Sequence, residues 1–114
     1  MLNAKEIDMG KVKFRVLEFK SISPFFEQEK DGSKPFTVRQ WHRKDCRFRS
    51  LALWDLACRR KGHKPDWLIK LTNPATGEYF YRRLEDVVYF PGQQGQGPMN
   101  DWLILYLGKE IKEE

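Results

Sequence analysis

Cysteine is scarce in this sequence, which contains only Cys46 and Cys58. The two do not form a closely spaced pair of the kind that holds a structural zinc ion. His42 and His63 could complete a set of two cysteines and two histidines, but the spacings do not match a zinc finger or ribbon. We therefore expect no metal and no cofactor, with one cysteine buried and the other at the surface.

Long apolar runs are also missing, and the first residues lack the charged start, apolar run and cleavage site of a secretory signal. The sequence therefore predicts a soluble, cytoplasmic protein with no membrane partner, and we expect a monomer. An aromatic share of 14% is too high for a disordered segment, and 114 residues without an internal repeat suit one domain. We place this domain at residues 11–108, between a flexible end at residues 1–10 and a charged tail at residues 109–114.

Acidic residues are few in residues 39–64. This segment holds nine basic residues and two acids, a charge of +7, whereas the whole chain carries +5, so the remainder carries −2. Clustered Lys and Arg side chains gain from displacing counterions condensed on phosphates, so RNA or another nucleic acid is the expected partner. A solvated surface that only maintains solubility is the alternative. The side chains that we expect to bind nucleic acid are Lys34, Arg39, Trp41, His42, Arg43, Lys44, Arg47, Arg49, Arg59, Arg60 and Lys61.

Apolar periodicity predicts five to six strands and two helices. Alternation indicates strands at residues 11–20, 36–39, 67–72, 78–84 and 102–107, with a further extended stretch at residues 84–90. A short helix is expected after Ser23 and Pro24, ending near Gly32, and a longer one from the N-cap Ser50 to residues 59–61. This order favours a small mixed β-barrel, of α+β or mainly β class, over alternating strand–helix units.

Some of these segments carry expectations about burial. In the longer helix we expect Leu53 and Leu56 on the buried face, with Trp54 beside it. The tryptophans of apolar elements, Trp54 and Trp102 among them, are expected in the core, whereas Trp41 is expected at the surface. Residues 41–48 and 91–98 are predicted to be loops.

Residues 32–39, Gly-Ser-Lys-Pro-Phe-Thr-Val-Arg, place a turn, a lysine, a hydroxyl and an arginine within one short span. Gly32 follows a polar run and predicts a turn, and the alternation after Lys34 predicts a strand. Thr37 and Arg39 would share the face of the strand opposite Phe36. This segment is therefore the best candidate site.

The pattern Gly32-x-Lys34-x-x-Thr37-x-Arg39, preceded by a strand and a short helix and followed by a hairpin and an apolar strand, resembles an ASCH domain of the PUA-like superfamily. The likeness in element order covers residues 11–108. It implies a small β-barrel with flanking helices that binds RNA in a cleft lined by the motif lysine. The basic helical segment within residues 43–64 departs from the shorter connection expected of the family.

The resemblance implies a second possible activity. Some members look like amidohydrolases that deacetylate a modified nucleoside, acetylcytidine, with a lysine, a threonine and a glutamate as catalytic residues. Lys34 and Thr37 match the first two positions. Glu85 is the candidate that we take for the third, with Glu78 as an alternative, although neither aligns with the family's glutamate.

The chemistry of the motif is compatible with either activity. A threonine hydroxyl is a good nucleophile only when a base accepts its proton, and a lysine does so only when burial or nearby cations lower its pKa. In binding, Lys34 and Arg39 would contact phosphate or a base edge, while Trp41, His42 or Tyr81 stacks on an unpaired base. The plain alternative is an ordinary surface on which Arg39 pairs with Glu27 or Glu29.

Overall fold

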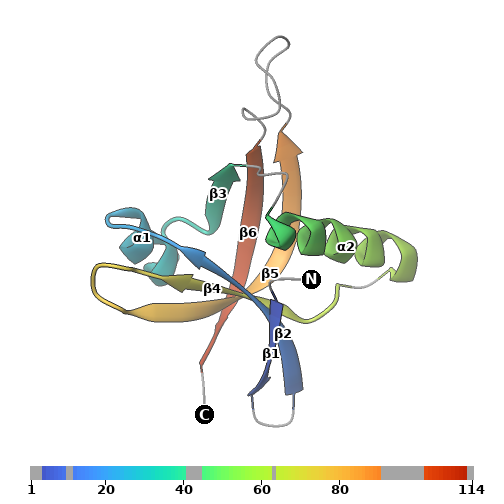
Figure 1. The fold of residues 1–114 in the computed structure, drawn as a ribbon, viewed down its shortest axis with the longest axis horizontal. Coiled ribbons are helices and arrows are strands. Elements are labelled where there is room, and N and C mark those ends of the chain that lie inside the picture. Colours follow the sequence, from blue (N-terminus) through green and yellow to red (C-terminus); the bar gives the residue numbers. More distant parts are fainter. Residues whose placement is uncertain (1–3, 10–11, 41–44, 63, 91–101, 113–114) are drawn as a thin grey trace.

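The computed structural model describes residues 4–9, 12–40, 45–62, 64–90 and 102–112. Within these ranges, two helices and six strands follow one another in an irregular order (Figure 1). In order, they are β1 (Ala4–Met9), β2 (Val12–Lys20), α1 (Phe25–Asp31), β3 (Phe36–Gln40), α2 (Cys46–Lys61), β4 (Trp67–Thr72), β5 (Tyr79–Phe90) and β6 (Trp102–Ile111). The predicted small α+β fold is confirmed at this level.

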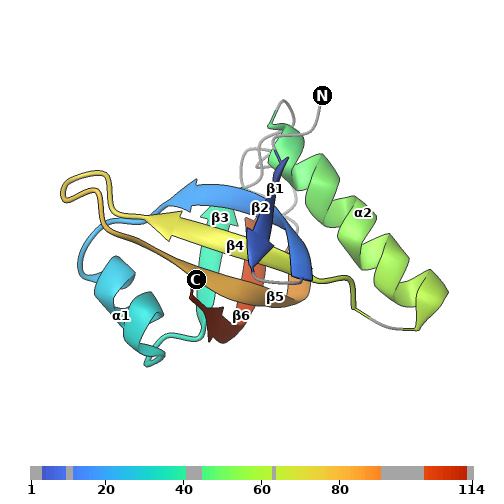
Figure 2. The ribbon, with the colours of Figure 1, turned by 90° about the horizontal axis from the view of Figure 1, so that it is seen from below.

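All six strands belong to one mixed sheet with the order β1-β2-β4-β5-β6-β3. The pair β2 and β4 is parallel, and every other neighbouring pair is antiparallel. The sheet curls into a half-barrel, with α1 and α2 at opposite ends of it (Figures 1 and 2). The order ends at β1 and β3, and β1 pairs with β2 only as far as Leu17. Among the described residues, the end of β2 at residues 18–20 therefore has no strand partner on that side, and we call the gap between this end of β2 and β3 the seam.

The long strand β5 produces much of this curl. Residues 79–83 of β5 pair with β4, residues 81–90 pair with β6 on the other side, and the register with β6 shifts around Leu84. Such irregularities bend a strand and increase its twist. The sequence therefore predicted two extended stretches, residues 78–84 and 84–90, where the structure has one strand.

The core lies on the inner side of the curled sheet. Alternate residues of β2, β4 and β6 point inward, among them Leu17, Ile69 and Leu105, each at 0% exposure. The helices close the core, since Phe26 of α1 packs edge-on against Phe80 with ring centroids 5.3 Å apart. Burial of these side chains supplies the main stabilising term, at about 1.5–3 kcal/mol for each large apolar side chain.

Helix α2 differs from the prediction in its start and its buried face. It begins after Asp45, whose carboxylate accepts a hydrogen bond from the Arg47 amide, whereas Ser50 lies inside the helix. The helix buries Phe48, Leu51 and Trp54, while Leu53 and Leu56 are exposed. The expected face is wrong because the loop predicted at residues 41–48 includes the first three residues of α2, and the prediction therefore omits Phe48 from the apolar stripe. The predicted end at Gly62 is confirmed by the left-handed backbone of this glycine and by the hydrogen bond that its N–H donates to the Cys58 carbonyl.

Strands extend further toward both ends of the chain than the apolar patterns suggest. The opening segment, for which no element was predicted, pairs along its length with β2 as β1. Strand β6 continues to Ile111, and its outer face is open, so Trp102 is exposed although we expected it in the core. No helix among the described residues has the length and apolar character needed to cross a membrane.

Candidate functional site

The predicted motif lines a cavity of about 370 Å³ at the seam between β2 and β3. We call this cavity the motif pocket. Helix α1 contributes one wall, the end of β2 another, and β3 the third. The residues that line it are Lys20, Ser21, Ile22, Phe25, Glu29, Lys34, Thr37, Val38 and Arg39.

A buried carboxylate forms the floor of the motif pocket. Glu29 is 1% exposed, and its two oxygens accept hydrogen bonds from Ser21 Oγ at 2.6 Å and from Lys34 Nζ at 2.8 Å. Burying a charge is costly unless it is paired and hydrogen-bonded, and this carboxylate has both kinds of partner. The Lys34 ammonium also lies 5.1 Å from the ring centre of Phe25 and 5.2 Å from that of Phe36. The lysine is therefore held in place from several sides.

Local structure explains why Glu29 reaches Lys34. Glu29 lies three residues after the buried Phe26 and so shares its helix face. Gly32, with φ +88°, ends the helix in the left-handed conformation that glycine adopts without strain. The Arg82 guanidinium donates to the last carbonyls of α1, at 2.7 Å to that of Lys30, and at 3.2 Å to that of Gly108 in β6. Helix α1 is thereby tied to the sheet.

The second half of the motif points into the seam. The Thr37 side chain is 1% exposed, and its hydroxyl accepts a hydrogen bond from Arg39 Nε at 3.2 Å. A terminal nitrogen of Arg39 donates at 2.6 Å to the carbonyl of Lys20 at the end of β2. Burial lowers the pKa of the Arg39 guanidinium, Glu29 opposes this change, and Arg47 adds to it. An incompletely solvated cation of this kind gains from an incoming anion.

The rim of the motif pocket is apolar and accessible. Ile22 is 61% exposed, Phe25 49% and Val38 42%. These three come from both sides of the seam, above a floor of charged and hydroxyl groups. A cavity with an apolar rim and a few polar groups suits a ligand with a flat or apolar body and polar edges.

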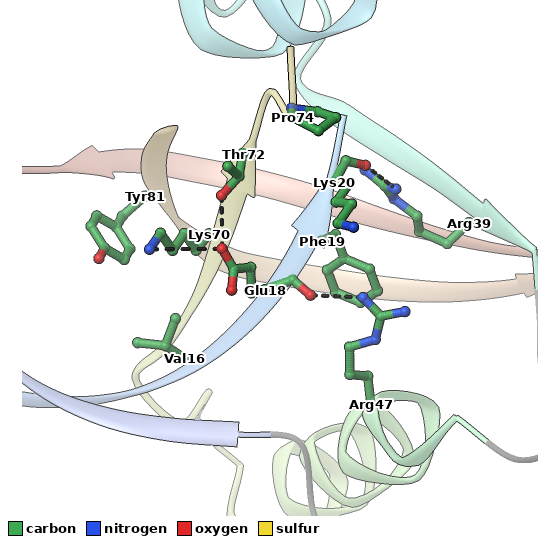
Figure 3. Close-up of a pocket in the computed structure, with 10 residues that line it drawn as sticks. All are labelled: Val16, Glu18, Phe19, Lys20, Arg39, Arg47, Lys70, Thr72, Pro74 and Tyr81. Atoms are coloured by element: carbon green, nitrogen blue, oxygen red, sulfur yellow. Dashed lines mark hydrogen bonds and ion pairs between the residues drawn. The ribbon is translucent and has the colours of Figure 1, made fainter. Parts of the chain in front are cut away.

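A larger cavity of about 800 Å³, which we call the basic groove, adjoins the motif pocket (Figure 3). The two share Lys20 and Arg39 in their walls. The groove extends over the outer side of β2 and β4 and reaches the start of α2. Its polar lining residues are Glu18, Lys20, Arg39, Arg47, Lys70 and Thr72.

Two arginines cover the free side of β2 in this groove. The carbonyls of Glu18 and Lys20 accept hydrogen bonds from Arg47 at 2.7 Å and from Arg39 at 2.6 Å (Figure 3). Both guanidinium groups also lie over the Phe19 ring, with Cζ to centroid distances of 4.3 Å for Arg47 and 5.1 Å for Arg39. Side chains therefore bridge the seam that backbone pairing leaves open.

The structure separates the predicted basic residues into groups. Lys34, Arg39 and Arg47 line the two cavities. Arg59 pairs with Asp55 at 3.2 Å near the far end of α2, about 18 Å along the helix axis from Arg47. Arg49 and Arg60 are exposed on the same helix, and Lys61 is its last residue. Trp41, His42, Arg43 and Lys44 lie outside the described residues.

The two glutamates considered as a third partner lie elsewhere. Glu85 pairs with Lys64 at 3.3 Å and contacts the backbone around Gly108, and Glu78 pairs with Lys30 at 3.4 Å. Neither lines the motif pocket. The carboxylate beside Lys34 is that of Glu29, which sequence reasoning considered only as a partner of Arg39. Its spacing from Phe26 was the available signal, because it predicts a glutamate on the buried face.

Other lining residues were also missed. The sequence predicts Phe25 within the short helix, and it predicts Glu18, Lys70 and Thr72 within the strands at residues 11–20 and 67–72. It indicates no role for these residues, or for Ile22, in a site. Glu18, Lys70 and Thr72 lie close together because β2 pairs in parallel with β4, which places Glu18 opposite Lys70. Strand pairing between segments so far apart is not readable from a local pattern. Tyr81, the one predicted stacking residue among those described, lines the basic groove rather than the motif pocket.

The fold and the site define a small α+β protein with a half-barrel sheet and two adjoining polar cavities at its open seam. No protein-family model, curated protein or solved structure matches the chain.

Proposed function

We propose that the protein binds a nucleotide unit, free or within unpaired nucleic acid, in the motif pocket. We also propose that it is an ASCH domain of the PUA-like superfamily, a proposal supported by the Gly32 to Arg39 pattern. The observation that carries the functional proposal is the composition of the pocket. It combines accessible apolar side chains at its rim with two partly buried cations, Lys34 and Arg39, that hydrogen bonds hold in place.

The apolar rim suits the base. A nucleobase has a flat apolar face and polar edges, and base–aromatic stacking contributes about 1–3 kcal/mol. Phe25 offers the aromatic face, and Ile22 and Val38 offer apolar contacts beside it. The Lys34 ammonium and the Thr37 hydroxyl lie below and supply polar groups for the base edge.

The cations at the wall suit a phosphate. Arg39 is anchored by Thr37 and by the Lys20 carbonyl, so its planar guanidinium is held before a ligand arrives. A pre-oriented guanidinium recognises phosphate with less loss of conformational freedom than a mobile one. Lys20 shares this wall and is exposed.

Substitution of the rim tests the proposal without disturbing the core. We expect Phe25→Ala to weaken binding of uridine monophosphate or of short single-stranded RNA by about 10-fold, in line with one lost stacking contact. Leu53→Ala, which removes an apolar side chain of similar exposure from α2, is the matched control and should leave the affinity unchanged. Calorimetric titration of both variants measures this. Equal affinity for wild type and Phe25→Ala, or no binding by the wild type, would reject the proposal.

A second candidate function is hydrolysis of an amide on a modified nucleoside such as acetylcytidine. The observation that favours it is the presence of Lys34, Thr37 and a carboxylate, that of Glu29, around one cavity. The ion pair limits the roles available, because a charged lysine donates hydrogen bonds and does not accept a proton. In this arrangement Lys34 suits protonation of the leaving amine better than activation of Thr37.

The two candidates are separated by an assay for turnover. If the protein is the hydrolase, acetylcytidine is converted to cytidine and acetate, and Thr37→Val and Glu29→Gln abolish the reaction. Glu85→Gln should retain it, because Glu85 pairs with Lys64 outside the motif pocket. Binding of cytidine or RNA without turnover would leave only the first proposal.

A further inference from the structure

The basic groove carries charge that its own acids do not neutralise. Each carboxylate that lines the two cavities, or pairs with a residue that does, already has a cationic partner: Glu29 with Lys34 at 2.8 Å, Glu18 with Lys70 at 3.7 Å, and Asp45 with Arg47. Lys20 and Arg39 lie between these pairs, in the wall common to both cavities. The excess positive charge is therefore concentrated where the motif pocket opens into the groove.

The groove extends away from this junction along β2 and β4. Lys70 lies opposite Glu18 in the parallel pair, and the Thr72 hydroxyl donates to the Glu18 carboxylate at 2.8 Å (Figure 3). The Lys70 ammonium lies 4.3 Å from the ring centre of Tyr79 and 5.8 Å from that of Tyr81. Cations thus follow the cavity from Arg39 and Arg47 at one side to Lys70 at the other.

The two cavities differ in size and in lining. The motif pocket, at about 370 Å³ with an apolar rim, suits one base. The groove, at about 800 Å³, has four cations in its lining, beside Glu18, the hydroxyl groups of Thr72 and Tyr81, and the apolar Val16, Phe19 and Pro74. Grooves of like charge that lead from a stacking site are how proteins follow the backbone of single-stranded nucleic acid. A free nucleoside or mononucleotide would leave the groove unused.

We propose that the ligand is a single strand of nucleic acid whose phosphate backbone leaves the motif pocket at Lys20 and Arg39 and continues along the basic groove past Lys70. This inference rests on the proposed binding function and makes it more specific. In this arrangement Lys70 contacts the phosphate backbone of the nucleic acid, and the negative charge of Glu18 repels it. Neither residue lines the motif pocket.

Two groove substitutions of opposite sign test this inference. The ligands are uridine monophosphate and a ten-nucleotide oligouridylate, each titrated at several salt concentrations. We expect the oligonucleotide to bind at least about 10-fold more tightly at low salt and to lose affinity steeply as salt rises. Lys70→Gln should weaken binding of the oligonucleotide about fivefold. It should also reduce the slope of log affinity against log salt concentration by about 0.7, as expected for the loss of one phosphate contact. Glu18→Gln should strengthen oligonucleotide binding by about threefold, since one repulsive charge is removed.

Neither substitution should alter the affinity for uridine monophosphate. Lys109→Gln, which removes an exposed lysine on β6 outside both cavities, is the matched control and should change oligonucleotide binding by less than about twofold. A gain of affinity in Glu18→Gln cannot result from misfolding, so the test remains decisive if Lys70→Gln is unstable.

The outcomes separate this inference from the proposed function. If both ligands bind equally and the groove variants have no effect, the inference is overturned and the motif pocket remains a nucleotide site. If neither ligand binds, both proposals fail. If a polyglutamate peptide of equal charge binds as tightly as the oligonucleotide and responds to the same variants, the groove recognises acidic polymers in general, which overturns the assignment to nucleic acid.

Discussion

The Lys34 ammonium lies 2.8 Å from the Glu29 carboxylate, which is buried beneath it and also accepts a hydrogen bond from Ser21. This pair joins the turn before β3 to helix α1 and fixes the floor of the motif pocket. It also orients the lysine as a hydrogen-bond donor at the pocket, which suits recognition of an anion or a base edge. The preference for a binding function follows from this relationship.

Removal of Lys34 should cost more stability than removal of an exposed lysine. Lys34→Met leaves the Glu29 carboxylate buried with Ser21 as its remaining described partner. We expect a loss of about 2 kcal/mol in the free energy of unfolding, below the full cost of breaking a buried pair because Lys34 is itself partly exposed. Urea denaturation measures the loss. Lys30→Met, which breaks the exposed pair with Glu78, should cost less than about 0.5 kcal/mol, and equal losses would contradict the account.

Arg82 should stabilise the motif pocket from a distance. Its guanidinium joins the carbonyl of Lys30 in α1 to that of Gly108 in β6. Arg82→Leu leaves these carbonyls without their donor, so we expect a loss of about 1–3 kcal/mol together with weaker ligand binding. The control is Arg83→Leu, which removes only a partly exposed pair with Asp66. A stable Arg82 variant with unchanged affinity would show that α1 is positioned by other contacts.

Two leucines on α2 should differ sharply in their contribution to the free energy of unfolding. Leu51 is 1% exposed and Leu53 47%, although the two lie two residues apart. Leu51→Ala should lower the free energy of unfolding by about 2–5 kcal/mol, because a cavity remains in the core. Leu53→Ala should change it by about 0.5 kcal/mol or less. Thermal or urea unfolding of both variants tests the observed helix face, and the reverse order would restore the face expected from the sequence.

The thiol of Cys58 should react slowly near neutral pH. Burial raises the pKa of this thiol, and the nearby Asp55 carboxylate acts in the same direction. Because the protonated thiol is favoured in the folded state, the contribution of Cys58 to stability is present below the unfolded pKa and is lost as pH rises through the folded pKa. Alkylation by iodoacetamide, followed by mass spectrometry, should therefore rise at higher pH in the folded protein than in urea. Coincident pH profiles would contradict this prediction.

The sequence predicted the motif and the elements around it, because a turn at Gly32 and alternation after Lys34 are local signals. It did not predict Glu29 as the partner of Lys34, since that contact requires α1 to fold back against β3. The basic groove was likewise hidden, because Glu18 and Lys70 are brought together only by the parallel pairing of β2 and β4. The positive charge of residues 39–64 is evident from the sequence. The sequence does not show that Arg39 and Arg47 line the cavities while Arg59 and Arg60 lie near the far end of α2, because this depends on where the helix begins and ends.

The central claim is that the ligand occupies the motif pocket, and an NMR titration of backbone amides with the oligouridylate tests it most directly. We predict that the largest chemical shift changes occur at Ser21, Phe25, Thr37 and Arg39, with smaller changes at Lys70. Amides near Arg59 and Arg60, at the far end of α2, should not shift. Changes confined to that end of α2, with none in the motif pocket, would contradict the account.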